Sequence, residues 1–179
     1  MRRVLMEYDF TLKFKLATDE IDVDSLVERL GEANCDDALV GIGQPGRIAL
    51  DFTREAKSAE AAIVSALADV KKAIPGARLV EVGPDFVGLS DVAEIVGVTR
   101  QNMRKLMLAH VSTFPMPLHE GSAAVWHLAP VLEWLKERGT YQFEQTVFEV
   151  ACTAMQVNLA KEVNSLVPRL RRELRRLVA

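Results

Sequence analysis

Hydrophobic residues in the first half of the chain recur with two different periods. From Tyr8 to Leu16 they occupy every second position, which predicts a half-buried strand. Residues 38–42, 47–52 and 79–82 are short apolar stretches that predict three more strands. Turn residues separate the second strand from the third, so these two strands are expected to form a hairpin.

Two helices are expected between the strands. Asp22 or Asp24 caps a helix through residues 25–30, and Ser58 caps a longer one over residues 59–74. These elements give the order β-α-β-β-α-β over residues 1–86. The order predicts an α+β fold with a ferredoxin-like sandwich as its N-terminal domain. The architecture supports many functions, so a role in regulation, partner binding or assembly is expected without a preference among them.

Residues 89–106 have the pattern of two short helices joined by a tight turn. Ser90 is expected to cap the first helix, and Gly97 to supply the left-handed residue that the turn requires. Thr99 is expected to cap the second helix, whose inner face includes Met103. A short helix, a glycine turn and a second capped helix are the geometry of a helix-turn-helix.

The residues after this motif predict a wing. Residues 114–119 and 123–127 flank the turn Glu120-Gly121-Ser122, and they are expected to pair as a two-stranded hairpin. Residues 128–139 predict a third helix. Pro130 is compatible with it, because proline is acceptable in the first turn of a helix.

The outer face of the second helix carries the candidate chemistry. Its polar side chains are Arg100, Gln101, Asn102, Arg104 and Lys105. Arginine pairs bidentately with guanine in the major groove, and glutamine and asparagine pair with adenine. A solvated polar face is the alternative explanation of such a run. The absence of acidic residues between positions 99 and 119 favours DNA.

The sequence from Leu89, Leu-Ser-Asp-Val-Ala-Glu-Ile-Val-Gly-Val-Thr-Arg-Gln-Asn, is followed by a proline-containing hairpin, an aromatic residue and a tryptophan-containing helix. Over residues 87–139 this order resembles the winged helix-turn-helix family of excisionases, AlpA and MerR. The resemblance implies a sequence-specific transcriptional regulator that binds double-stranded DNA, with the second helix in the major groove and the wing on the backbone or in the minor groove. The residues that it assigns to DNA binding are Thr99, Arg100, Gln101, Asn102, Arg104, Lys105, His119 and Ser122.

Residues 140–179 have a helical pattern. An apolar stripe runs along them, and Pro168 must interrupt or begin a helix. The stripe consists of Phe143, Val147, Val150, Ala151 and Met155, and Leu159 and Val163 continue it. This tail is expected to form a homodimer, because one recognition helix reads only a few base pairs and two-fold pairing extends the site. The arginines of the tail are either the solvated face of a terminal helix or an auxiliary basic arm for nucleic acid: Arg169, Arg171, Arg172, Arg175 and Arg176.

Charge is distributed unevenly along the chain. Residues 1–87 hold 11 lysines and arginines against 16 acidic residues, whereas residues 139–179 hold 6 against 4. An acidic domain is repelled by a phosphate backbone, so DNA contacts are expected from the later segments.

Several other classes are disfavoured. No apolar run reaches the ~18 residues of a membrane span, and no secretory signal is recognised, so a cytoplasmic protein without a membrane partner is expected. Cys35 and Cys152 are expected to be reduced thiols. The three histidines lack metal-ligand spacing, so neither a metal nor a cofactor is expected. No nucleophile or carboxylate pair has a catalytic partner, so an enzyme is not expected.

Two other functions compete with DNA binding. A winged helix can serve as a protein-interaction adaptor or an antitoxin, and the overall acidity and Glu120 at the wing tip favour a protein partner. The chain could also be a ligand-sensing regulator whose N-terminal domain receives a small molecule.

Overall fold

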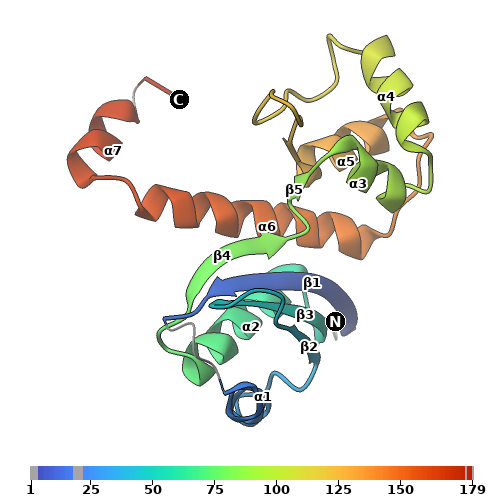
Figure 1. Cartoon of the computed structure of the whole chain (residues 1–179). Helices are drawn as coiled ribbons and strands as arrows, with labels where there is room; N and C mark the ends of the chain where they lie inside the picture. The colour runs from blue at the N-terminus through green and yellow to red at the C-terminus, as the bar shows by residue number, and fades with distance from the viewer. Residues whose placement is uncertain (1–3, 18–21, 176, 179) are drawn as a thin grey trace.

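The computed structural model describes residues 4–17, 22–175, 177 and 178. Within these residues the chain is a mixed α+β protein with a four-stranded antiparallel sheet and seven helices (Figure 1). The elements are β1 (Met6–Lys15), α1 (Val23–Glu32), β2 (Ala38–Gly41), β3 (Arg47–Ala56), α2 (Ala59–Ala73), β4 (Arg78–Gly83), β5 (Phe86–Val87), α3 (Leu89–Ile95), α4 (Arg100–Ala109), β6 (Trp126–His127), α5 (Leu128–Arg138), α6 (Gln145–Asn164) and α7 (Pro168–Leu174).

The first six elements follow one another in the predicted order. The strands lie in the order β2-β3-β1-β4, so β2 and β4 are the two edges of the sheet. The central pair is in register from Met6 opposite Ala56 to Lys15 opposite Arg47. Asp22 caps α1 and Ser58 caps α2, as the sequence predicts, and each side chain accepts a hydrogen bond from the backbone three residues on.

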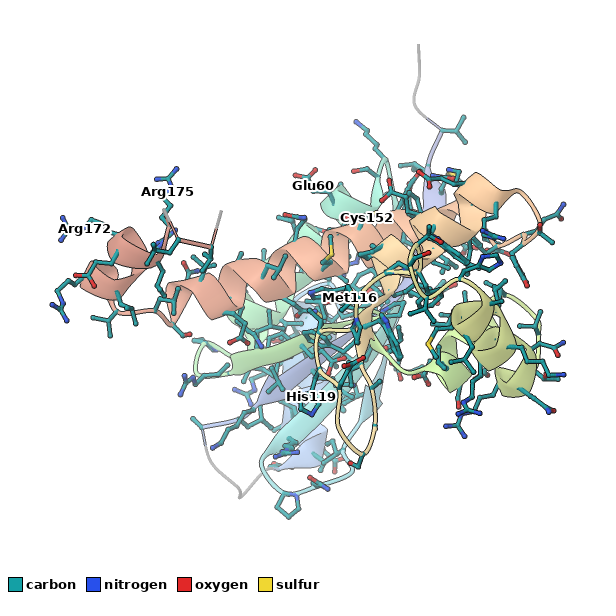
Figure 2. All side chains as sticks on the ribbon, turned by 90° about the horizontal axis from the view of Figure 1, so that it is seen from above. Glu60, Met116, His119, Cys152, Arg172 and Arg175 are labelled. Carbon is teal, nitrogen blue, oxygen red and sulfur yellow. The ribbon has the colours of Figure 1, made fainter. Side chains whose placement is uncertain are left out.

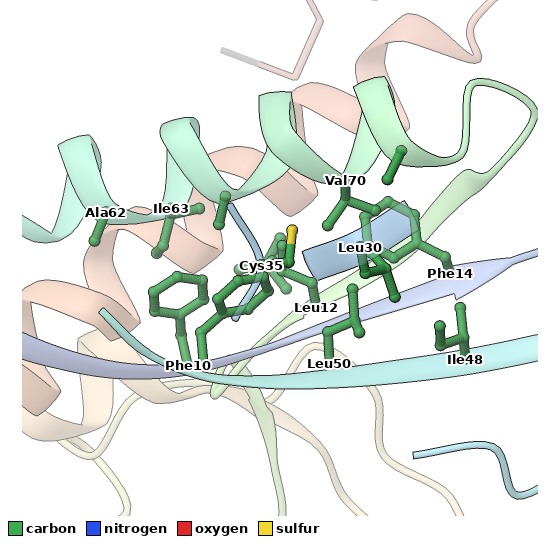
Figure 3. Close-up of a cluster of buried hydrophobic side chains, with 14 of the residues drawn as sticks. Phe10, Leu12, Phe14, Leu30, Cys35, Ile48, Leu50, Ala62, Ile63 and Val70 are labelled. Carbon is green, nitrogen blue, oxygen red and sulfur yellow. The ribbon is translucent and has the colours of Figure 1, made fainter. Parts of the chain in front are cut away.

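The period-two pattern of β1 places its apolar side chains on one face of the sheet, where α1 and α2 cover them (Figure 3). Phe10 of β1 and Phe52 of β3 stack with ring centroids 5.2 Å apart. Ile63 and Val70 of α2 are fully buried against this layer. The core is therefore continuous between the sheet and the helices.

A buried arginine forms ion pairs and hydrogen bonds at the edge of this core. Arg54 of β3 contacts Asp37 at 2.6 Å and Asp69 of α2 at 2.8 Å. Its guanidinium also donates to the carbonyl of Asn34 at 2.7 Å and lies 4.9 Å from the ring centroid of Phe52. One side chain thus connects β3, α2 and the segment after α1 with charge-assisted hydrogen bonds.

A second apolar core holds α3, α4, α5 and β6 together, with Met103, Trp126 and Leu132 among its buried members. The predicted cap of α3 is wrong. Ser90 lies inside the helix, and the N-cap is Gly88, whose N–H donates to the Asp91 carboxylate at 2.7 Å. A carboxylate near a helix N-terminus satisfies free N–H groups, which explains why Asp91 replaces the serine in this role.

The predicted wing hairpin forms only in part, where the N–H of Val125 donates to the carbonyl of His119 and the N–H of Leu118 to that of Val125. Residues 114–119 and 123–127 share one isolated bridge, between His119 and Val125. Trp126 and His127 pair instead with Val87 and Phe86 as strands β6 and β5. The aromatic ring of Phe114 packs edge-on against Trp126 and Trp134, so the first half of the loop is held by core contacts rather than by a ladder.

Helix α6 lies between the two cores (Figure 1). Val150 and Ala154 belong to the core of the sheet, whereas Ala151, one position away, belongs to the second core. The prediction that Leu159 and Val163 continue the buried stripe is wrong, because both are exposed. None of the helices in the described part of the chain has the length and hydropathy that a membrane-spanning helix requires.

Buried Asn158 of α6 closes one edge of the sheet. Its side chain accepts from the N–H of Val82 at 2.9 Å and donates to the carbonyl of Val82 at 2.8 Å. Its amide also donates to the fully buried carboxylate of Asp85 at 2.7 Å, and the other carboxylate oxygen lies 2.7 Å from His127 Nδ1. Lys161 donates to the carbonyl of Val80. Edge strand β4 is therefore covered by a helix.

Asn158→Leu should lower the free energy of unfolding by about 3 kcal/mol. The change leaves both backbone groups of Val82 and the Asp85 carboxylate without their amide partner in a buried place. Urea denaturation followed by circular dichroism measures the effect. Gln156→Leu, at an exposed position of the same helix, is the matched control and should stay within about 0.5 kcal/mol of the original chain. Equal urea midpoints for the two variants would contradict the role of Asn158.

The two cysteines are both free, and they should differ in reactivity. Burial, reinforced by the negative charge of Asp69, raises the pKa of Cys35 to about 11. At pH 8 only about one such thiol in a thousand is a thiolate, which is the reactive form. Burial also raises the pKa of Cys152, but this residue is only half-buried.

A disulfide reagent should therefore label Cys152 slowly and Cys35 only after urea unfolding. Titration of the thiols in the Cys35→Ser and Cys152→Ser variants separates the two rates. Fast native labelling of Cys35 would show that its part of the core opens readily.

Candidate nucleic-acid interface

Helix α4 is positioned by the turn that precedes it. Gly97 has φ of +70°, a left-handed conformation that favours glycine, and it lets the chain reverse within a few residues of α3. Thr99 then caps α4, because its hydroxyl oxygen accepts a hydrogen bond from the N–H of Asn102 at 3.2 Å. The predicted glycine turn and the predicted cap are both confirmed.

The buried side of α4 determines which of its side chains point toward solvent. Met103 is fully buried and Met107 is half-buried against the second core. Because a helix turns once every 3.6 residues, Gln101 and Lys105 lie on the side opposite Met103. The side chains at the predicted contact positions of α4 are all exposed: Thr99, Arg100, Gln101, Asn102, Arg104 and Lys105.

The cationic side chains of α4 form no ion pair with the described acidic residues. Among the described residues, no carboxylate oxygen lies within 4.0 Å of the charged groups of Arg100, Arg104 or Lys105. Arg100 and Arg104 are four positions apart, so they share one face, and together with Gln101 they line one open hollow. Guanidinium groups in this state can each make a bidentate contact with a phosphate or a guanine edge.

Helix α4 lies on the far side of the second core from the sheet, with α3 and α5 between it and α6 (Figure 1). The acidic N-terminal part of the chain is therefore kept away from the cations. The aspartates of the open sheet face are already engaged: Asp51 accepts from the hydroxyl of Thr11 at 2.6 Å, and Asp9 accepts from that of Thr53 at 2.6 Å.

In the described part of the chain, no three His, Cys, Asp or Glu side chains are grouped so that they could hold a metal ion.

The two predicted wing residues lie apart from the helix. His119 and Ser122 are exposed on the loop between α4 and β6, and Figure 2 shows His119 on the part of this loop that extends away from α6. None of the hydrogen bonds or ion pairs among the described residues joins either one to α4. The indole of Trp126 donates to the carbonyl of Pro115 at 3.0 Å, which anchors the start of the loop.

A contact at the other end of α4 is not visible in the sequence pattern. Arg138, at the end of α5, lies 2.8 Å from the ring nitrogen Nε2 of His110, the C-cap of α4. Its guanidinium also lies 4.7 Å from the ring centroid of Trp134. These contacts join the ends of α4 and α5. The residues are 28 positions apart, so no local periodicity indicates them.

The sequence and the structure were compared with protein-family models, with curated proteins and with solved structures, and none of them matches the chain. The functional interpretation therefore depends on the residues of this chain alone.

Proposed function

We propose that this protein is a sequence-specific, double-stranded-DNA-binding transcriptional regulator in which α4 enters the major groove. The observation that carries the proposal is the exposed face of α4, where Arg100, Arg104 and Lys105 lie without acidic partners on a helix capped by Thr99. Helices that read DNA present donors and cations near their N-terminal end in this way.

The surrounding elements support a winged helix-turn-helix. A short helix, a left-handed glycine and a capped second helix precede a loop, strand β6 and a third helix, as in the excisionase, AlpA and MerR family that residues 87–139 resemble. The strand order β2-β3-β1-β4 with two helices on one face supports a ferredoxin-like sandwich for the N-terminal domain.

Each contact residue has a role that suits its chemistry. Arg100 and Arg104 pair with guanine edges, and Gln101 and Asn102 pair with adenine edges. The remaining predicted contacts go to the phosphate backbone, from Thr99 and Lys105 at the helix and from His119 and Ser122 at the wing. Base contacts supply sequence preference, and phosphate contacts supply position and affinity.

A protein partner is the second candidate function, and one observation favours it. Apolar side chains gather on α4 and the loop after it, where Leu108, Val111, Met116 and Leu118 are between 52% and 80% exposed. Such a surface fits an adaptor or antitoxin that binds a protein through its wing. A third candidate is a ligand sensor, since a hollow lined by Asp9 and Asp51 of the sheet extends to Ile95 of α3.

The Arg100→Ala, Arg104→Ala double variant should lose DNA binding. The probe is duplex DNA from upstream of the protein's own gene, followed by fluorescence anisotropy in a salt titration. Loss of two base contacts should weaken binding by about 2–6 kcal/mol, and discrimination against a random duplex should fall with it. The Arg47→Ala, Arg78→Ala double variant is the matched control, because both arginines are exposed and lie opposite Lys15 in the sheet.

Two outcomes separate the candidates. Tight binding that weakens steeply with salt and is lost only in the α4 variant supports a DNA-binding regulator. Binding no stronger than to a random duplex, with all three proteins alike, contradicts the proposal. In that case Met116→Ser and Leu118→Ser variants would test the adaptor function against isolated partner proteins.

The C-terminal part of the chain should form the proposed homodimer. Leu159 and Val163 are exposed four positions apart on α6, and Leu166 and Leu170 are exposed in the connection and in α7, so a second copy would bury them. Sedimentation equilibrium should give a dimer for the original chain and a monomer for a Leu166→Asp, Leu170→Asp variant. Val64→Asp, at an exposed apolar position of α2, is the control. A monomer in the original chain, with and without DNA, contradicts the dimer.

A further inference from the structure

The last helix carries a second group of cations. Helix α7 begins at Pro168 and is followed by a further turn, in which the N–H groups of Leu177 and Val178 donate to the carbonyl of Leu174. Arg169, Arg171, Arg172 and Arg175 are all exposed in this segment. Among its described residues the only acid is Glu173, which lies 3.8 Å from Arg169.

The arginines are arranged as a row. Arg172 lies three positions from both Arg169 and Arg175, so each neighbouring pair is about one turn apart and shares a side of the helix. Together with Glu173 and Leu177 they line an open hollow of about 900 Å³. Figure 2 shows the labelled Arg172 and Arg175 extending away from the ribbon at the end of the molecule. In the described part of the chain, no carboxylate lies within 4.0 Å of the guanidinium groups of Arg172 and Arg175.

The arginine row lies beyond the part of α6 that packs on the sheet. Asn158 and Lys161 fasten α6 to β4, and every described residue from Glu162 to Val178 except Leu174 is exposed. The last part of α6 thus projects beyond the sheet and carries α7 with it (Figure 1). In that view α7 and α4 lie toward opposite ends of α6, and both stand on the side of α6 away from the sheet.

We propose that the arginine row of α7 is a second phosphate-backbone contact for the same DNA duplex that α4 reads, an inference that rests on the proposed function. A duplex carries a phosphate at regular short intervals, so a row of guanidinium groups on one side of a helix matches it in charge and in repetition. The three cations of α4 are few for a chain of net charge −3, and the row supplies the charge that α4 lacks. The exposed apolar positions of the tail remain available to the second copy.

The test is a salt-titrated anisotropy measurement on the full chain and an Arg172→Gln, Arg175→Gln variant. Two probes of about 30 bp, or three helical turns, are used: the upstream duplex and a random-sequence duplex. Loss of two phosphate contacts per protomer should reduce the slope of log affinity against log salt by about 2 for each protomer bound, and it should weaken both duplexes by the same factor, about tenfold or more. The Arg100→Ala, Arg104→Ala variant should instead lose preference for the upstream duplex.

The matched control is Arg47→Gln, Arg78→Gln, which removes the same charge from the sheet. It should leave both affinities within about twofold of the original chain. An unchanged salt slope in the α7 variant, while the original chain binds DNA and depends on Arg100 and Arg104, overturns the second contact but keeps the proposed function. Absence of binding in the original chain overturns both. A change of sedimentation in the α7 variant without a change of salt slope assigns the row to the dimer and also overturns the contact.

Discussion

The structure depends on the buried amide of Asn158. It satisfies both backbone groups of Val82 at the edge of the sheet and the carboxylate of Asp85 at the start of the second core, and that carboxylate also contacts His127. Edge strands and buried carboxylates are each costly without partners, and one side chain removes both costs. The sheet, α6 and the second core are therefore joined by one hydrogen-bonded group.

This junction explains why the cationic surface of α4 has a defined position. Val150 and Ala151, adjacent on α6, are buried in different cores, so the helix cannot turn about its axis without exposing apolar surface in one of them. The carbonyl of Asp85 also accepts from the N–H of Leu128 at 2.7 Å, which fixes the start of α5 and, through the Arg138–His110 contact, the end of α4. The cations of α4 are thus carried by an element that packs on this support, and those of α7 by the helix that follows α6 along the chain.

The features of the fold that were predicted correctly are those with a local sequence pattern. The alternation along β1 and the caps Asp22, Ser58 and Thr99 are local patterns, and they are confirmed. The cap of α3 was wrong because Gly88-Leu89-Ser90-Asp91 holds two possible capping groups, and the helix begins earlier than predicted, with Gly88 as N-cap and Asp91 as the partner of its N–H. The buried stripe of α6 was wrong beyond Met155, because a buried asparagine looks polar in a hydrophobicity pattern. Asn158 is recognisable only once Val82 and Asp85 are known to lie beside it.

The same separation of local from tertiary information holds for the candidate interface. The run from Arg100 to Lys105 is visible in the sequence because it is contiguous and free of acids. The wing is not, because Phe114 and Trp126 carry the same apolar signal whichever strands pair. Here Phe114 packs on Trp126 and Trp134, and Trp126 pairs with Val87. The sequence shows that acidic residues are concentrated in the first half of the chain, and the fold shows how far they lie from the cations. The acidic residues are concentrated in the sheet domain, where Asp9 and Asp51 accept from threonine hydroxyls and Asp37 and Asp69 hold Arg54. Their charges are thus engaged locally and lie on the far side of α6 from α4 and α7, so an acidic chain can present two cationic surfaces to a polyanion.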